Sequence, residues 1–262
     1  MQEQLDDAWT NGSYEQIASA YYSMAGRLVE RTAVSPDDEV LDIGCGAGSV
    51  AITAARRGAQ VTGVDVTPAM LDHARKNAKI ADTEEIEWQK GNALNLPFEA
   101  DRFDVTLSSL GHMYGDPPEE TTAELLRVTR SGGTIGFTSW TPTSLFPFMA
   151  SILTTYLDPD DLPEFTEPPF AWGDSGVVRE RLGGEVEQLS FETGTVLFPA
   201  LSPEHFWRKM TETSGPLIAL LDAVPAENRP EVDEEMVETI HPYFDEGQNG
   251  VELEYSLTTA KR

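Results

Sequence analysis

The segment Val40–Gly48 constrains this chain more than any other, because an apolar stretch in it runs directly into three alternating glycines. Glycine lacks a Cβ and adopts positive φ readily, so a ligand can lie against the backbone at Gly44, Gly46 and Gly48. The residues that follow, 49–57, have the apolar spacing of a helix. We therefore predict a buried strand, a tight ligand-binding turn and a helix. A turn that binds nothing is the alternative.

The spacing of the glycines separates two kinds of nucleotide ligand. A dinucleotide-binding turn reads G-x-G-x-x-G, but here Ser49 occupies the third position and the third glycine comes one residue earlier. Asp42 lies just before the turn, at the end of the strand where ligands of α/β sheets bind. A carboxylate attracts an ammonium group and repels a pyrophosphate. The turn therefore favours S-adenosylmethionine (SAM), whose methionine part carries an ammonium group, over NAD.

A second strand is expected at residues 60–65, and it ends in Asp65, about 20 residues after the first glycine. A carboxylate at this position can accept hydrogen bonds from both ribose hydroxyls, so Asp65 is the expected ribose ligand. Thr67 and Pro68 are typical of a helix start, with Thr as N-cap and Pro in the first turn. Met70, in the same helix, packs either beside the adenosine or in the core.

Several segments in order along the chain match one known family. The chain resembles the class I SAM-dependent methyltransferases, especially the enzymes of ubiquinone and menaquinone biosynthesis. The resemblance implies an α/β, Rossmann-like fold: a seven-stranded, mostly parallel sheet with an antiparallel last strand, helices on both faces and added helical cap insertions. The matching segments are residues 40–48, 61–68, 91–98, 103–113, 125–133 and 135–142.

The resemblance also implies a set of cofactor-binding residues. The methionine part would contact the glycine turn and its acid, the ribose Asp65, and the adenine Asn92 and Ala93. The family usually has Asp where Asn92 stands, and Asn still accepts a hydrogen bond, in a weaker, uncharged form. The implied residues are Asp42, Gly44, Gly46, Asp65, Val66, Met70, Asn92, Ala93, Ser108, Ser109, Tyr14 and Tyr22.

Two groups within this set have a structural alternative. Ser108 and Ser109 follow the fourth expected strand and would line the sulfonium end of SAM, or they are simply small residues in a turn. Tyr14, Tyr21 and Tyr22 would close over the cofactor, as the equivalent segment does in the family, or they form an aromatic helix face on the core.

The chain divides into an N-terminal helical segment that acts as a lid (1–35), a cofactor core (36–142) and a C-terminal part (143–262), all within a single domain. One helix is expected at 14–31, followed by five strand–helix units up to residue 140. The C-terminal part completes the sheet and carries helices that cap the substrate. Its expected helices lie near 145–157, after an Asp174 cap, after Ser202-Pro203, near 217–223 and near 230–244, and its strands at 186–198 and 251–259.

Methyl transfer requires little of protein side chains. The sulfonium of SAM is already activated, so holding the acceptor in line in a dry pocket supplies most of the acceleration. A base is needed only where the acceptor loses a proton, and His112 is the best-placed candidate, with a structural histidine as the alternative. His73, His205 and His241 have no ligand spacing, so we predict no metal. Cys45, the single cysteine, fits the turn as a small residue rather than as a nucleophile.

The charge of the chain is strongly negative. A net charge of −27 arises from 45 acidic against 18 basic residues, and the acids are spread along the whole chain. This distribution favours a protein of a halophile, with a surface adapted to a salty cytoplasm, over a patch for a basic partner or cationic substrate. Clustered Lys and Arg are missing, so nucleic acid is not an expected partner. The chain has no signal-peptide pattern and no membrane-spanning run, which predicts a soluble cytoplasmic protein.

The sequence thus predicts a SAM-dependent methyltransferase that acts on a small molecule and releases S-adenosylhomocysteine. A quinone-like or otherwise lipophilic acceptor is suggested by aromatic residues of the C-terminal part, which could also form its own core. An NAD(P)-dependent oxidoreductase and a SAM-binding protein without catalysis are the alternatives, because fold alone does not establish chemistry. The aromatic residues are Phe146, Phe148, Trp172, Phe206 and Trp207.

Overall fold

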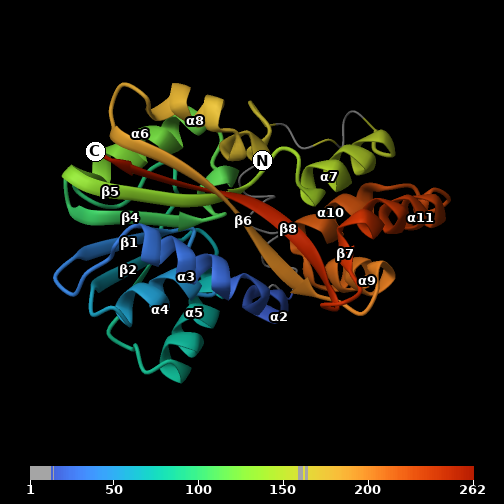
Figure 1. Ribbon diagram of the computed structural model, residues 1–262, viewed down its shortest axis with the longest axis horizontal. Coiled ribbons are helices and arrows are strands. Elements are labelled where there is room, and N and C mark those ends of the chain that lie inside the picture. The colour runs from blue at the N-terminus through green and yellow to red at the C-terminus, as the bar shows by residue number, and fades with distance from the viewer. Residues whose placement is uncertain (1–12, 14, 159–161, 163–164) are drawn as a thin grey trace. The chain divides into compact units, whose positions relative to one another are not determined.

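A computed structural model describes residues 13, 15–158, 162 and 165–262 of the chain (Figure 1). Within this part, eight strands form one sheet. Seven of them lie in the order β3-β2-β1-β4-β5-β8-β6, and the short β7 pairs with β8. The Rossmann-like α/β fold expected from the sequence is confirmed.

The parallel half of the sheet comes from the expected cofactor core. β1 pairs in parallel with β2 and β4, β2 with β3, and β4 with β5. β1 and β4 are buried along almost their whole length, as is typical of parallel strands covered on both faces. The strands are β1 (Glu39–Ile43), β2 (Gln60–Asp65), β3 (Glu87–Lys90), β4 (Phe103–Ser109) and β5 (Thr129–Trp140).

Helices connect three of these strands to the next. α4 (Ser49–Ala55) follows β1, α5 (Pro68–Ile80) follows β2, and α6 (Pro118–Val128) lies between β4 and β5. The prediction of a helix after every strand is wrong for β3, which is followed by a loop. In that loop Asn95 N–H donates to the Asn92 carbonyl (3.0 Å), closing a tight turn instead of a helix.

The last strands reverse direction. β8 (Gly250–Lys261) is antiparallel to β5, and Phe137 lies opposite Thr258. This confirms the antiparallel last strand that the sequence predicted. β6 (Glu187–Pro199) lies beside β8, and the short β7 (Phe244–Asp245) pairs with β8 in the antiparallel direction.

Adjacent residues of β5 show that both faces of the sheet are covered. A Cβ on Gly136 would lie 2.3 Å from Thr32 Cγ2, at the end of α3 (Tyr22–Arg31). Phe137 points to the other face, since side chains alternate along a strand. Its ring lies 4.5 Å from the ring of His112 and 5.4 Å from that of Trp172.

The N-terminal helix is not continuous. The sequence predicted one helix over 14–31, but the structure has α2 (Glu15–Ala18), a 3-10 turn η1 (Ser19–Tyr21) and then α3. Tyr21 closes the turn and packs its ring against Trp140, with the two centroids 5.7 Å apart. The buried residues of α3 are Met24, Ala25, Leu28 and Val29.

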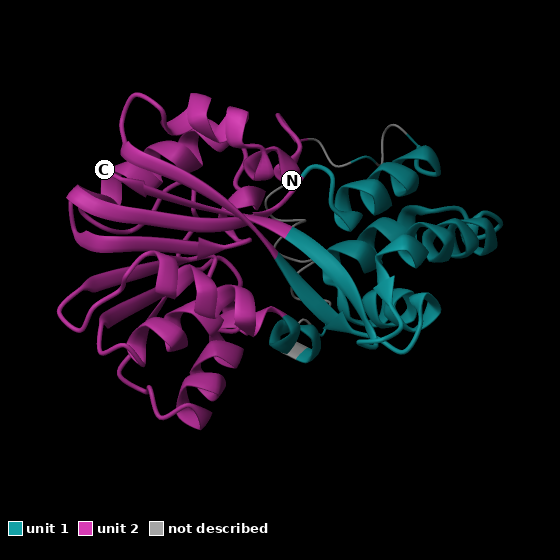
Figure 2. Ribbon diagram, viewed as in Figure 1, with its two compact units in different colours: residues 1–20, 142–164, 195–254 teal, residues 21–141, 165–194, 255–262 magenta. Residues whose placement is uncertain are grey.

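The chain forms two compact units (Figure 2). One unit contains residues 21–141, 165–194 and 255–262, and thus most of the sheet together with η2 (His112–Tyr114), η4 (Pro169–Gly173) and α8 (Ser175–Leu182). The other contains residues 1–20, 142–164 and 195–254. Its helices are α2, α7 (Leu145–Thr155), α9 (Pro203–Thr213), α10 (Gly215–Ala223), α11 (Arg229–Ile240) and η5 (His241–Tyr243).

Helix caps explain where two of these helices begin. The Asp174 carboxylate accepts hydrogen bonds from the N–H groups of Gly176 (2.7 Å) and Val177 (3.1 Å), so α8 starts where the sequence predicted. Ser202 Oγ accepts from His205 N–H (3.1 Å) and starts α9 in the same way. No helix among the described residues is both long and apolar enough to cross a membrane.

Candidate functional site

The glycine turn between β1 and α4 has the geometry that its sequence requires. Gly44, Gly46 and Gly48 have φ values of 63°, 50° and 88°, in the left-handed region that favours glycine. Cys45 N–H donates to the Val64 carbonyl at 3.0 Å, which ties the turn to β2. The turn therefore lies at the carboxyl ends of two neighbouring parallel strands, where α/β sheets bind ligands.

Cys45 is enclosed within this turn. It is buried, and burial raises the pKa of its thiol well above the ordinary value. A Cβ on Gly63 would lie 3.2 Å from the Cys45 sulfur and 2.5 Å from the Trp88 ring. Small residues on β2 thus make room for both side chains. The thiol is a packing group, in agreement with the sequence prediction.

Asp65 holds the turn from the end of β2. Its Oδ2 accepts a hydrogen bond from Gly46 N–H (2.8 Å), and its Oδ1 accepts one from Thr67 N–H (2.9 Å). Thr67 is the N-cap residue of α5, as the sequence predicted, but its side chain makes no capping hydrogen bond. The bond from Thr67 N–H to Asp65 instead fixes the start of α5 to the end of β2.

Asp42 is the other acid of the turn. Its Oδ2 accepts from Ala51 N–H (3.0 Å) in the first turn of α4, while Oδ1 is buried without a partner in the described part of the chain. The pKa of this carboxyl is raised to about 8, mainly by burial and to a smaller extent by the charge of Asp65, while the Ala51 hydrogen bond opposes the rise. An unpaired buried carboxylate oxygen is a site for a cationic group.

The expected adenine residues lie in the turn that follows β3. Gly91 N–H donates to the Asp65 carbonyl (3.0 Å), so the turn starts beside the end of β2. Asn92 and Ala93 are half-buried, and Asn92 Oδ1 accepts from Leu94 N–H (3.0 Å), which fixes the direction of its amide. Of the other residues in the expected set, Val66 is half-buried and Met70 is buried on α5.

Ser108 and Ser109 have different environments at the end of β4. Ser108 is fully buried: its Oγ donates to the Ile43 carbonyl (2.7 Å) and accepts from His112 N–H (2.9 Å). Ser108 thus takes the structural alternative and links the end of β1 to η2. Ser109 is half-buried, and its Oγ lies 2.9 Å from Thr138 Oγ1 and 3.4 Å from Met24 Sδ.

His112 does not have the surroundings of a general base. Its ring is fully buried, with Nε2 3.2 Å from Ser139 Oγ and the ring of Trp172 4.8 Å away. Burial, with a smaller effect of the Arg181 charge, lowers its pKa to about 3. Desolvation keeps this imidazole neutral and enclosed, so these surroundings favour the structural alternative for His112 over the expected role as a base.

The tyrosines expected to cover the cofactor fall into three cases. Tyr14 lies outside the described residues. Tyr21 is buried against Trp140 and takes the core alternative, whereas the Tyr22 side chain is 51% exposed at the start of α3. Tyr22 remains a predicted cofactor contact.

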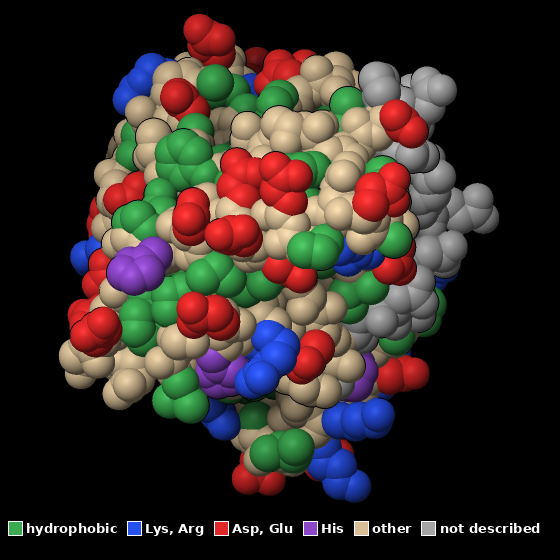
Figure 3. All heavy atoms as spheres, turned by 90° about the vertical axis from the view of Figure 1, so that its right-hand side faces the viewer, with side chains coloured by type: hydrophobic (Ala, Val, Ile, Leu, Met, Phe, Trp, Pro, Cys, Tyr) green, Lys and Arg blue, Asp and Glu red, His purple; other side chains and the backbone are tan. Residues whose placement is uncertain are grey.

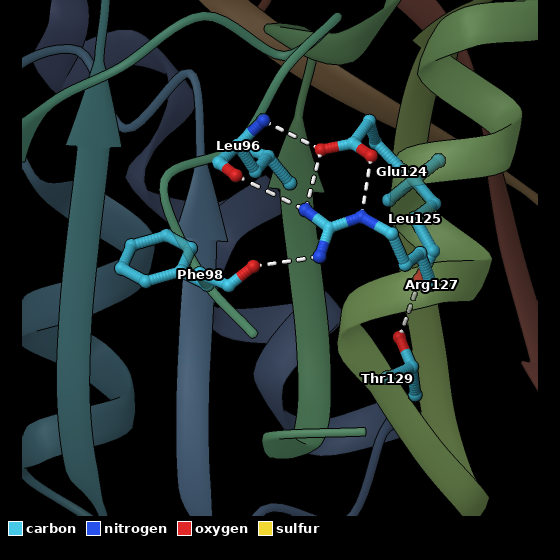
Figure 4. A network of polar contacts seen from close by, with 6 residues as sticks. All are labelled: Leu96, Phe98, Glu124, Leu125, Arg127 and Thr129. Atoms are coloured by element: carbon cyan, nitrogen blue, oxygen red, sulfur yellow. Dashed lines mark hydrogen bonds and ion pairs between the residues drawn. The ribbon is translucent and has the colours of Figure 1, made fainter. Parts of the chain in front are cut away.

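Two structural features near the glycine turn were not predicted from the sequence. Gly111 packs against the backbone of Gly44, and no local pattern marks it. Glu124 and Arg127 of α6 bind the backbone of the loop after β3 (Figure 4). Their i,i+3 spacing was the only available signal. Among the described residues no group of three or more His, Cys, Asp or Glu could hold a metal ion.

Comparisons with known proteins add an independent line of evidence. A family model described as a methyltransferase domain matches residues 40–133, which include the glycine turn and both acids. Two proteins of Mycobacterium tuberculosis (strain ATCC 25618 / H37Rv), both described only as uncharacterized, are 30% and 31% identical to this chain. Each match covers 97% of this chain and 92% of the relative.

A second relative and a solved structure have more specific descriptions. A 2-phytyl-1,4-naphtoquinone methyltransferase of Synechococcus elongatus is 34% identical over 139 residues, which are 46% of this chain and 59% of that protein. A phosphoethanolamine N-methyltransferase of Haemonchus contortus, solved with phosphomonomethylethanolamine and S-adenosylhomocysteine, has a TM-score of 0.57 at 15% identity. That match covers 92% of this chain and 52% of the other, and it shows the fold alone.

The dinucleotide alternative finds no support, since the domain that matches over the glycine turn is a methyltransferase domain. The similarity to the mycobacterial proteins extends over nearly the whole of both chains. The chain therefore belongs to the same family as these two mycobacterial proteins, and its residues 40–133 match a methyltransferase domain.

Proposed function

We propose that this protein transfers the methyl group of SAM to a lipophilic, quinone-like small molecule. The observation that carries the cofactor assignment is the glycine turn with an acid on either side of it. Asp65 is bonded to the turn through Gly46, and Asp42 is bonded to the helix that follows it. A SAM-binding site needs this combination of close backbone approach and negative charge.

The residues present fit the methionine part of the cofactor. Asp42 Oδ1 is a buried acceptor without a partner among the described residues, and an ammonium group would satisfy it. Gly44 and Gly46 follow Asp42 in the same turn, with φ values of 63° and 50°. We assign the methionine part to these three residues, the ribose to Asp65 with Val66, and the adenine to Asn92, Ala93 and Met70. Tyr22 and Ser109 complete the proposed set.

Catalysis in this proposal rests on positioning. SAM supplies an activated methyl group, and the protein holds the acceptor in line and excludes water. His112 supplies no base, because its pKa is lowered to about 3 and its ring is fully buried. An acceptor that is already nucleophilic, such as an electron-rich or ionised quinol ring, fits this arrangement.

The proposal of a quinone-like acceptor is supported by the name of one relative and not by the aromatic residues of the C-terminal part. The Synechococcus relative bears the name of a naphthoquinone methyltransferase and matches part of this chain. Of the aromatic residues that suggested a lipophilic acceptor, Trp172, Phe206 and Trp207 are buried in the packing, while Phe148 is 45% exposed. Burial explains these three by core formation alone.

The experiment that tests the cofactor assignment is isothermal titration calorimetry in concentrated KCl with SAM, S-adenosylhomocysteine and NADH. Binding of the first two without the third supports the proposal. Binding of NADH alone contradicts it and restores the oxidoreductase alternative. Turnover is then followed by mass spectrometry with a panel of quinols, phenols and amines. SAM binding without methylation of any acceptor would favour a non-catalytic SAM-binding protein.

A further inference from the structure

The loop between β3 and β4 has no helix or strand to satisfy its backbone. Buried backbone N–H and C=O groups need partners, and in this loop side chains of α6 provide several of them. Figure 4 shows Arg127 directed at the loop, with Glu124 beside it. Both residues lie on α6 at an i,i+3 spacing and form an ion pair, with Arg127 Nε 2.6 Å from Glu124 Oε1.

The two side chains bind the loop at three backbone atoms. Arg127 Nη1 donates to the Phe98 carbonyl (2.6 Å) and Nη2 to the Leu96 carbonyl (3.0 Å). Glu124 Oε2 accepts from Leu96 N–H (2.5 Å) and from Arg127 Nη2 (2.7 Å). Arginine suits this task because its planar group presents several N–H donors in a fixed geometry. We call Glu124 and Arg127 the α6 clamp.

The clamp is partly shielded from water. The Glu124 side chain is 13% exposed and that of Arg127 is 34% exposed. Burial raises the pKa of Glu124, but the hydrogen bonds from Arg127 and Leu96 N–H outweigh it, and the net pKa is lowered. The hydrogen bond to Glu124 raises the pKa of Arg127. Both groups stay charged at neutral pH, so the bonds to the loop are charge-assisted.

The clamp holds the loop next to the proposed adenine residues. The turn begins at Gly91, whose N–H donates to the Asp65 carbonyl (3.0 Å). Asn92 lies in the turn with its amide direction fixed by Leu94 N–H, and Leu96 is the first residue that the clamp binds. The turn is therefore fixed at its start by β2 and at its end by α6.

We propose that the α6 clamp is a positioning device for base recognition: by fixing the loop, Glu124 and Arg127 allow Asn92 to select adenine. This inference rests on the proposed SAM-dependent function. A fixed Asn92 Oδ1 accepts a hydrogen bond from the exocyclic amine of adenine but meets an oxygen in hypoxanthine. A mobile Asn92 amide can turn its N–H₂ group toward that oxygen, so Asn92 no longer distinguishes adenine from hypoxanthine.

The test compares the binding of S-adenosylhomocysteine and S-inosylhomocysteine by calorimetry. We expect the unmodified protein to prefer the adenine ligand about tenfold, the effect of one hydrogen bond replaced by a mismatch. Arg127→Gln is expected to bind both ligands with nearly equal affinity. Arg130→Gln is the matched control. Arg130 pairs with Asp104 (2.7 Å) and donates to the Asp101 carbonyl (3.3 Å), beyond the segment 96–98 that the clamp binds, so the ratio of affinities is expected to be unchanged.

A second variant distinguishes a specific effect on base selection from a general loss of folding. Arg127→Lys keeps the charge but not the forked donors, and it is expected to lower the preference for adenine without loss of the thermal transition. An unchanged ratio of affinities in Arg127→Gln or Arg127→Lys overturns the inference, including the case in which both ligands bind more weakly by the same factor. Failure of the unmodified protein to bind either ligand would instead contradict the proposed function.

Discussion

Gly44 and Gly111 meet backbone to backbone. A Cβ built on either residue would lie 2.7 Å from the Cα of the other, and one on Gly111 would also lie 2.8 Å from the Gly44 carbonyl oxygen. Leu110, just before Gly111, has a φ of 66°, which is rare for a large residue, and its N–H donates to the Thr138 carbonyl (2.9 Å). The loop after β4 thus packs directly against the glycine turn.

This contact predicts the effect of Gly111→Ala. Gly111 has an ordinary φ of −70°, so the added methyl group acts only through its clash with the turn. We expect a loss of about 1–3 kcal/mol in the free energy of unfolding, as for other overpacked sites, together with weaker binding of S-adenosylhomocysteine. Urea denaturation and calorimetry measure the two effects.

Gly26→Ala is the matched control for this substitution. Gly26 lies in α3, and a Cβ there would meet nothing within 4 Å. Its replacement is expected to stabilise the protein by about 0.5–1 kcal/mol, because alanine favours the helix. A Gly111→Ala protein as stable as this control would contradict the backbone contact.

Asp42 predicts a pH dependence of stability. The pKa of this carboxyl is raised to about 8 in the folded protein from an ordinary value of 3.8, so the folded state binds the proton more tightly than the unfolded state. Its stabilising contribution is complete below about pH 4 and is lost as the pH rises to about 8. In Asp42→Asn this loss is absent, so the variant gains stability relative to the parent protein as the pH rises. Urea denaturation across this range measures the difference, and parallel curves would contradict the raised pKa.

His112 predicts the opposite sign. Its pKa is lowered to about 3 by burial, so its contribution to stability is complete above about pH 6.5 and is lost as the pH falls toward 3. The imidazole resonances, assigned by their disappearance in His112→Gln, are expected to show no titration between about pH 5 and pH 8 in NMR spectra. A midpoint near neutral pH would restore the general-base hypothesis.

Asn92→Asp predicts a gain in cofactor affinity. The carboxylate accepts the same hydrogen bond from Leu94 N–H and offers a charged acceptor to the adenine amine. We expect S-adenosylhomocysteine to bind about threefold to tenfold more tightly, measured by calorimetry. Asn95→Asp adds the same charge to an exposed residue of the same turn and serves as the control. Equal effects of the two substitutions would mean that position 92 has no special role.

The acidic surface predicts that salt stabilises the protein. The net charge is −27, and on the face in Figure 3 the acidic side chains are scattered among apolar ones rather than gathered in one patch. At about 1 M salt the screening length falls to about 3 Å, which removes most of the repulsion between these groups. The melting temperature is expected to rise with KCl, and more than in sucrose of equal osmolality. A melting temperature independent of KCl would count against salt adaptation.

Local patterns were sufficient for much of the fold and for part of the site. Alternation of apolar stretches with helical spacing predicted the strands from β1 to β5, and the residues Asp174 and Ser202 marked helix starts that the structure confirms. Each of these signals acts over a few residues, so the sequence alone displays it. The sequence indicated a turn at residues 96–98 of the loop after β3. It did not predict the tight turn closed by Asn92 and Asn95, because that turn depends on backbone contacts that no periodicity reveals.

By itself the sequence determined the glycine turn, the acids beside it and the presence of a last strand, since φ preference, charge and apolar alternation are properties of neighbouring residues. The antiparallel direction of that strand was implied by the family resemblance. Only the tertiary structure decided that His112 is buried and neutral, that Gly111 rests on Gly44 and that Arg127 holds the loop at Leu96. These relationships join residues far apart in the chain. Burial and packing depend on what the fold brings beside a residue, and that information is in no single stretch of sequence.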